Sequence, residues 1–263
     1  MIILKSEEEV RAIRRSSQIV AKVLAGLEQM IEPGISTKEL DMFAEKRARE
    51  MGAVPAFKGY RGYPASLCTS INEEIIHGIP STRELHEGDI ISLDFGVVYE
   101  GYYGDAAVTY PVGKVSSEAK ALIDTAEKAF FKGFEQVRGG CRISDISHAI
   151  QNYVESQGFS IIRAFVGHGI GLSLHEEPQI PNFGSPGQGP KIKEGMVLAI
   201  EPMIAAGDWN VEIHEDNWTA VTKDRSLSSH YEHTVALTRE SAEILSLLDE
   251  EERLSYVKES PYA

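Results

Sequence analysis

Apolar residues recur at helical spacing in two stretches near the amino terminus. The first stretch follows Ser6-x-x-Glu9 and the second follows Ser36-x-x-Glu39, and both tetrads match the S-x-x-E capping box that begins many helices. The second helix is expected from about Thr37 to Met51, before Gly52. The first is expected to end at Pro33-Gly34 and to bury Val10, Ile13, Ile19, Val20, Val23, Leu24 and Leu27.

Two β-strands are predicted in DIISLDFGVVYEGYYGDAAVTYPVG (89–113), inside a strand-rich region from about 65 to 112. The chain is expected to turn near Tyr99 to Gly101. Residues that face each other across a tight hairpin differ in number by an odd amount, and Asp94 and Asp105 differ by 11. We therefore expect both carboxylates on one face of the hairpin at cross-strand distance, ~5 Å between their Cβ atoms.

The order helix, helix, strands then repeats. Residues 26–30 (GLEQM) are echoed by 133–137 (GFEQV), and Ile35-Ser36 is echoed by Ile143-Ser144. The pattern indicates a single α+β domain over residues 1–263, with pseudo-equivalent halves at about 7–112 and 117–240 and a site between them. Two unrelated helical hairpins would also give such echoes by chance, so duplication remains one of two interpretations.

Composition excludes several classes of protein. The chain has 263 residues, 42% hydrophobic residues and a net charge of −14. It contains no basic stretch of the kind that nucleic-acid-binding proteins carry. No apolar run approaches the ~18 residues of a membrane span, and MIILKSEEEV is unlike a signal peptide. Two cysteines without paired spacing fit a reducing compartment, so a cytoplasmic protein is expected.

Five potential metal ligands interrupt otherwise apolar segments. Taken singly, each could be an ordinary turn or loop residue, but strand interiors are depleted in Asp and Glu, and buried carboxylates need a cation or several donors. Four carboxylates with a single imidazole are too acidic for a structural zinc site and suit two bridged divalent ions. The candidates are Asp94, Asp105, His168, Glu201 and Glu232.

At this point the motifs resemble a known family, the metallopeptidases of the pita-bread fold, and within it the type I methionine aminopeptidases. The resemblance extends from about residue 4 to 247. It implies an α+β fold with helices packed outside a curved antiparallel sheet around a dinuclear metal site. The segments that carry it are SINEEIIHGIP (70–80), DFGVVYEGYYGDAA (94–107), GHGIGLSLHEEP (167–178), AIEPM (199–203) and DNWTAVTKDRSLSSHYEHT (216–234).

The resemblance also implies roles for the candidate ligands. Asp105 and Glu232 would bridge two divalent ions, Asp94 would serve mainly one, and His168 and Glu201 would serve the other. Oxygen-rich ligation is compatible with Co, Mn, Fe or Zn. A monovalent cation near Asn72 and Ser228 is a further implied feature.

The implied activity is hydrolysis that removes the initiator methionine when the second residue is small. A water between the ions would attack the scissile carbonyl, with Glu201 as proton shuttle. His175 would stabilise the oxyanion, and His77 would position the adjacent backbone. The methionine pocket would be lined by Tyr60, Tyr63, Cys68, Leu174 and Trp218. The implied partners are nascent polypeptides at the ribosome. The protein itself is expected to be a monomer and to bind neither nucleic acid nor membrane.

Two positions depart from the family pattern. Leu172 stands where a basic residue is frequent, and Leu174 replaces a frequent aromatic residue. GHGIGL followed by HE also occurs in Xaa-Pro aminopeptidases and prolidases, which are the main alternative, although these usually carry an additional amino-terminal domain. A binding protein that kept this fold and lost the chemistry is the second alternative, and it predicts a missing ligand. The 31-residue interval between Glu201 and Glu232 leaves no room for the helical insert of type II enzymes.

Overall fold

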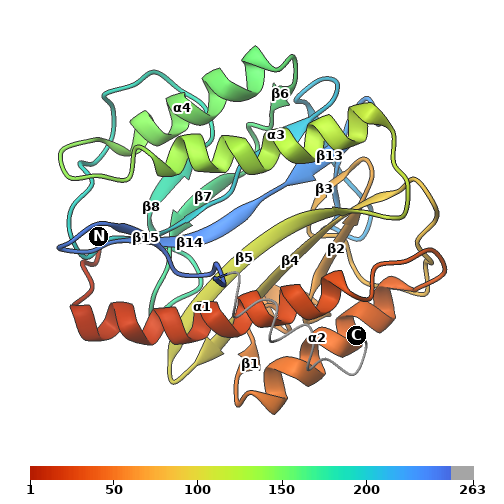
Figure 1. The fold of residues 1–263 in the computed structure, drawn as a ribbon, viewed down its shortest axis with the longest axis horizontal. Coiled ribbons are helices and arrows are strands. Elements are labelled where there is room, and N and C mark those ends of the chain that lie inside the picture. Colours follow the sequence, from red (N-terminus) through yellow and green to blue (C-terminus); the bar gives the residue numbers. More distant parts are fainter. Residues whose placement is uncertain (250–263) are drawn as a thin grey trace.

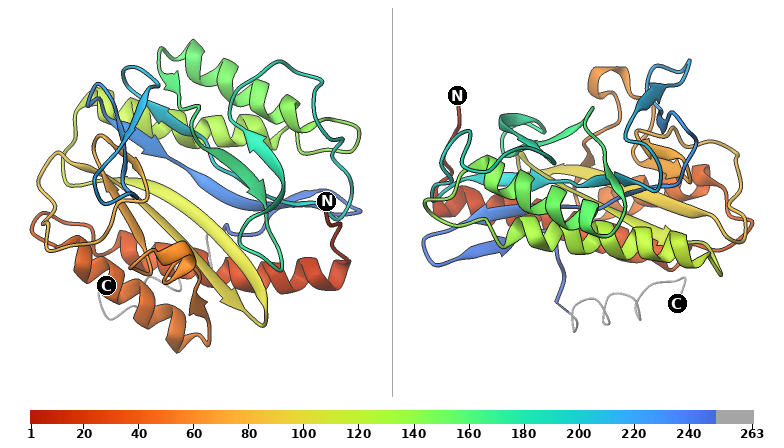
Figure 2. Two further views of the ribbon diagram at one scale, coloured as in Figure 1. Left: turned by 180° about the vertical axis from the view of Figure 1, so that it is seen from behind. Right: turned by 90° about the horizontal axis from the view of Figure 1, so that it is seen from above.

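The computed structural model describes residues 1–249 and places the helices on one side of a central β-sheet (Figure 1). Figure 1 views the molecule from the helical side, and the left panel of Figure 2 views it from the side of the sheet. The helices are α1 (Glu7–Glu28), α2 (Thr37–Glu50), α3 (Ser117–Phe134) and α4 (Ile143–Ser156), with a short 3-10 turn η1 (Tyr60–Gly62).

Both predicted capping boxes are present. The Ser6 hydroxyl accepts from the Glu9 backbone N–H, and Ser36 and Glu39 repeat the arrangement at the start of α2. All seven residues expected inside α1 are buried. The helix ends at Glu28, ahead of the predicted Pro33-Gly34, because the chain already turns at Gln29-Met30, where the Met30 N–H donates to the Leu27 carbonyl at 2.9 Å.

The described residues form one sheet of nine strands and two small three-stranded sheets. The large sheet runs in the order β1-β4-β5-β14-β9-β7-β8, with β2 paired to β4 and β15 paired to β14. The strands are β1 (Val54–Pro55), β2 (Cys68–Ile71), β3 (Glu74–Ile76), β4 (Ile90–Tyr99), β5 (Tyr102–Pro111), β6 (Ser160–Ile161), β7 (Val166–Gly169), β8 (Glu176–Pro181), β9 (Val197–Ile200), β10 (Met203–Ala205), β11 (Val211–Ile213), β12 (Ala220–Thr222), β13 (Ser228–His230), β14 (Glu232–Leu237) and β15 (Ala242–Ile244).

The hairpin β4–β5 corrects one detail of the sequence-based expectation. Its loop is the pair Glu100-Gly101, both with positive φ (+50° and +84°), which is the geometry of a tight two-residue turn. Centred on that pair, the register places Asp94 opposite Ala107 and Asp105 opposite Gly96. The two carboxylates therefore share one face, as predicted, but as diagonal neighbours rather than direct partners, because the turn lies one residue later than direct pairing requires.

The two chain halves meet where β5 pairs with β14. Helices α1 and α2 pack with Phe95 and other β4 residues, whereas α3 and α4 pack with β9 and β14, so each half contributes a helical pair to the same side of the sheet. We call this side the outer face and the opposite side the inner face. The arrangement helix, helix, strands is present in both halves, and its origin by duplication remains a prediction. No helix within residues 1–249 has the length and apolar character needed to cross a membrane.

Candidate metal centre

Strand register alone brings the five candidate ligands to the inner face. Asp94 lies opposite Ala107 on β5, and Ala107 in turn lies opposite Glu232 on β14. Further across the sheet, Ala199 of β9 lies opposite His168 of β7. Because side chains alternate along a strand, Asp105 points to the same side as Ala107, and Glu201, just beyond β9, to the same side as Ala199. The sheet thus gathers side chains from positions 94 to 232 on one surface.

The four carboxylates lie close together, and several of their oxygens lack a hydrogen-bond partner among the described residues. Asp105, Glu201 and Glu232 are buried, and the oxygens Asp94 Oδ1, Asp105 Oδ1 and Glu232 Oε1 have no hydrogen-bond partner among the described residues. Burial raises the pKa of Asp94, Glu201 and Glu232 well above the usual range, and the neighbouring carboxylates raise each pKa further. Burial also raises the pKa of Asp105 to about 7.

This electrostatic arrangement fits bound divalent cations. Like charges in a low-dielectric site are costly unless they are neutralised by protons or cations. The unpartnered oxygens supply the hard donors that such ions prefer, and an imidazole adds a borderline donor. The residues present therefore suit a divalent metal centre.

His168 is held in a defined tautomer. Its Nδ1–H donates to the Gly169 carbonyl at 2.9 Å, which leaves the Nε2 lone pair facing Glu201 Oε1 at 3.5 Å. Burial lowers the pKa of His168 to about 3, so the ring is neutral. The flanking glycines allow the close approach expected from the sequence, since a Cβ at Gly167 would lie 2.4 Å from the Ala199 carbonyl oxygen.

Neighbouring polar groups fix the backbone that carries the carboxylates. The Thr234 hydroxyl donates to the Asp105 carbonyl at 2.8 Å and accepts from the Asp105 N–H at 3.2 Å, which ties β5 to β14 beside the site. The buried Asn182 amide donates to the Glu201 carbonyl at 2.9 Å. Such outer contacts orient ligands and are usually needed for full metal affinity.

A cavity of about 160 Å³ opens onto these side chains. It is smaller than the 300–1,000 Å³ that is typical of drug-sized ligands, so it fits about one side chain. Tyr63 is pinned by hydrogen bonds from its hydroxyl to the Leu67 and Gly78 carbonyls and meets Trp218 edge-on at 5.1 Å between ring centroids. All five residues expected in the pocket line this cavity: Tyr60, Tyr63, Cys68, Leu174 and Trp218.

The two further histidines also line the cavity. His175 Nδ1 lies 2.8 Å from the Tyr60 hydroxyl, and its ring lies 4.3 Å from that of His168. His77 has a positive φ of +61° and meets Trp218 edge-on, and backbone strain of this kind is concentrated at functional sites. Burial lowers the pKa of His175 and lowers that of His77 to about 4, so both rings are neutral.

The two residues that depart from the family pattern lie in different environments. Leu174 is buried and lines the cavity, whereas Leu172 is 54% exposed and lies outside the cavity lining. The Leu172 N–H donates to Glu176 Oε1 at 2.8 Å, which turns its side chain to the surface. At the expected monovalent-cation position, the Ser228 N–H donates to the Asn72 carbonyl at 2.8 Å, so these two residues are in contact.

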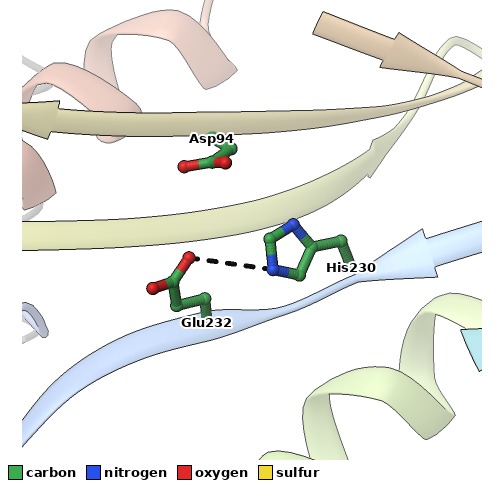
Figure 3. A group of neighbouring side chains, drawn as sticks. All are labelled: Asp94, His230 and Glu232. Carbon is green, nitrogen blue, oxygen red and sulfur yellow. Dashed lines mark ion pairs between the residues drawn. The ribbon is translucent and has the colours of Figure 1, made fainter. Parts of the chain in front are cut away.

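Four residues of the cavity were not predicted. Phe57 comes from the loop before η1, Arg61 from η1 itself and Ile76 from β3, where the sequence gives no periodic signal. The fourth, His230, lies beside Asp94 and Glu232 (Figure 3). His230 ends β13 and Glu232 begins β14. Side chains two positions apart in an extended segment such as SSHYEHT point to the same side, and this spacing was the available signal.

Comparison with known proteins agrees with this geometry. The model of metallopeptidase family M24 matches residues 11–239. A methionine aminopeptidase of Clostridium acetobutylicum is 52% identical over 250 residues, which cover 95% of this chain and 100% of that protein. The crystal structure of methionine aminopeptidase from Thermotoga maritima is similar with a TM-score of 0.93 and 44% identity, over 94% of this chain and 100% of that one.

The main alternative branch is more distant. The prolidase from Pyrococcus furiosus has a TM-score of 0.73 and 23% identity, and the matched region covers 94% of this chain but 66% of the prolidase. This likeness shows the shared fold alone. The predicted pita-bread fold is confirmed, and the chain belongs to metallopeptidase family M24, with the type I methionine aminopeptidases.

Proposed function

We propose that this protein is a metal-dependent aminopeptidase that removes the initiator methionine from nascent proteins whose second residue is small. One observation carries the proposal: a cluster of four carboxylates and an imidazole forms one wall of a narrow cavity otherwise lined by aromatic and apolar side chains. Relatives that share about half of their residues with this chain over nearly full length are methionine aminopeptidases, which supports the same substrate here.

Two divalent ions would be held by Asp94, Asp105, His168, Glu201 and Glu232. Asp105 and Glu232 would bridge, because each offers two carboxylate oxygens and both lie between the other ligands in the sheet order. Co, Mn, Fe and Zn all suit this donor set. A monovalent cation near Asn72 and Ser228 would steady the loop beside β3 and β13.

Bound ions of this kind supply a water activated for attack on a carbonyl. Glu201 would accept a proton from that water and pass it to the leaving amine. His175 would donate to the scissile carbonyl as negative charge develops there, with its ring set by the Tyr60 hydroxyl. His77, which also lines the cavity, would position the backbone next to the scissile bond.

The cavity explains the choice of the first residue. Cys68 lies directly opposite Asp94 across β2 and β4, so the apolar pocket begins beside the metal ligands. Methionine is unbranched, and its sulfur packs well against the edges of aromatic rings such as Tyr63 and Trp218. A small second residue would leave room beside His77.

The setting of the activity follows from the substrate. The partner would be the amino terminus of a nascent polypeptide at the ribosome, reached by a monomer in the cytoplasm. The net charge of −14 gives no support for direct binding to nucleic acid.

The test is release of the first residue from Met-Ala-Ser and from Ala-Pro-Ala, with added Mn or Co and with chelator. We expect metal-dependent release from the methionyl peptide alone. Release from the prolyl peptide alone would instead assign the protein to the Xaa-Pro branch. Tight retention of metal without hydrolysis of either peptide would indicate a binding protein.

A further inference from the structure

Two groups of potential ligands converge on the inner face, and they are built alike. One consists of Asp105, His168 and Glu232, and the other of Asp94, His230 and Glu232, with the ligand atoms within each group all within 4.8 Å of one another. Each group has two carboxylates and one imidazole, and Glu232 belongs to both. The family pattern uses only the first imidazole, whereas Figure 3 shows the second one, His230, facing Glu232 and Asp94.

The imidazole of His230 is buried and makes no hydrogen bond to any residue that the structure describes. It is 2% exposed, and neither Nδ1 nor Nε2 has a hydrogen-bond partner among the described residues. The nearby His233 shows the ordinary alternative, because its ring nitrogens contact the Ser246 and Tyr231 hydroxyls at 2.8 and 3.1 Å. A buried polar group left unpaired destabilises a fold, so His230 requires a partner that these residues do not provide.

The distance from His230 to Glu232 indicates what that partner is. His230 Nε2 lies 3.7 Å from Glu232 Oε2, which is beyond hydrogen-bonding range. Two ligand atoms that each bind one ion at about 2.0–2.2 Å lie about 3–4 Å apart. The pair His168 Nε2 and Glu201 Oε1, at 3.5 Å, has the same relation on the other side of the site.

We propose that His230 is a sixth ligand of the dinuclear centre and binds, through Nε2, the ion that Asp94 and Glu232 hold. Each ion would then have one imidazole, His168 or His230, with Glu232 between them. The inference rests on the dinuclear centre of the proposed function. It predicts a stronger preference for imidazole-binding ions such as Fe or Zn over Mn than an all-carboxylate position would show.

The experiment counts imidazoles in the protein loaded with two equivalents of Co(II). Each histidine bound to Co(II) gives one exchangeable N–H resonance with a large hyperfine shift in the proton NMR spectrum. We expect two such resonances in the wild type, one in His230→Gln and one in His168→Gln. The matched control is His233→Gln, which changes the other buried histidine of this segment on the outer face and is expected to keep both resonances.

A second readout is metal affinity. Titration of the metal-free protein with Mn(II) and Zn(II) is expected to show at least a ~10-fold loss of Zn(II) affinity in His230→Gln at one of the two sites, with a smaller change for Mn(II). Circular dichroism of the metal-free variants checks that the fold is kept.

The wild-type count decides the matter even where a variant fails to fold. A wild type that binds two Co(II) ions but shows a single resonance, lost in His168→Gln, would overturn the role of His230 while the dinuclear centre stands. A wild type that binds no divalent ion would overturn both.

Discussion

Along β14, Glu232 and Thr234 point to the inner face of the sheet, whereas His233 and Val235 point to the outer face. The inner residues have unpartnered oxygens or hold the backbone of Asp105. On the outer face, Val235 packs in an apolar core with α3 and α4, and His233 packs against Phe130 with both ring nitrogens satisfied. The same strands therefore carry a destabilising cluster of carboxylates on the inner face and an apolar core on the outer face. The core stabilises the fold against the repulsion within that cluster.

Removal of an inner carboxylate is expected to have the largest effect. Asp105→Ala should abolish loading of both ions and lower peptide release by more than ~10³-fold, about 4 kcal/mol in transition-state stabilisation. The metal-free variant should stay folded, because loss of Asp105 relieves repulsion among buried carboxylates. Metal analysis, peptide release and circular dichroism test this, and a variant that still holds two ions would show the ligand assignment to be wrong.

The matched change on the outer face is Phe95→Ala, beside Asp94. Phe95 is fully buried in the core formed with α1 and α2, so its truncation should lower the free energy of unfolding by about 3–5 kcal/mol. The fraction that remains folded should still bind two ions. Chemical denaturation and metal analysis give both quantities, and loss of metal from fully folded protein would show that the two faces are not independent.

His175 lies on the inner side but is expected to act on the substrate rather than on metal binding. His175→Ala should lower kcat by ~10²–10³-fold with KM and metal content little changed, because one donor to the developing oxyanion is lost. Steady-state kinetics with a methionyl peptide test the split. A change confined to KM would instead indicate a role in substrate binding alone.

The smallest expected effect concerns pH. The pKa of Asp105 is about 7 in the folded protein, so between pH ~4 and ~7 the folded state keeps a proton that the unfolded state has released. Its contribution to the stability of the metal-free protein is therefore present below about pH 4 and is lost as pH rises toward and through 7.

The buried histidines have lowered pKa values, so their contribution to stability changes with pH in the opposite sense to that of Asp105. The quantity to measure is therefore the difference in the free energy of unfolding between wild type and Asp105→Asn. Denaturation in chelator should show the stability of wild type relative to Asp105→Asn falling as pH rises through this window. Added divalent ion should reverse the trend, because bound cations favour the ionised carboxylate. A difference independent of pH would contradict the raised pKa.

Local elements were predictable because their signals are local. The capping boxes at Ser6 and Ser36, the seven buried positions of α1 and the hairpin around Glu100-Gly101 all follow from residues within a few positions of one another. The exact pairing of Asp94 and Asp105 was missed, because a one-residue change in the centre of the turn shifts every partner by two while it preserves the face.

The residue types of the candidate site were predictable from the sequence, but only some of the residues that line it were identified. Asp94, Asp105, His168, Glu201 and Glu232 were identified because charged residues are rare inside apolar strands and because the motifs resemble a known family. His230 was missed because a histidine among serines interrupts no apolar run. Phe57 reaches the cavity from the loop before η1 and Arg61 from η1 itself, and neither short segment has a sequence period.

The sequence by itself determined the helices and their caps, the hairpin, the acidic donor set and the class of chemistry, because each depends on short-range patterns of residues. Tertiary structure decided which side chains meet. Pairing of β5 with β14 brings Asp105 beside Glu232, from nearly half of the chain away, and His230 at the end of β13 lies beside Asp94 and Glu232. Contacts of this kind depend on which strands become neighbours, and only the packing of both helical pairs on one face of the sheet selects that order.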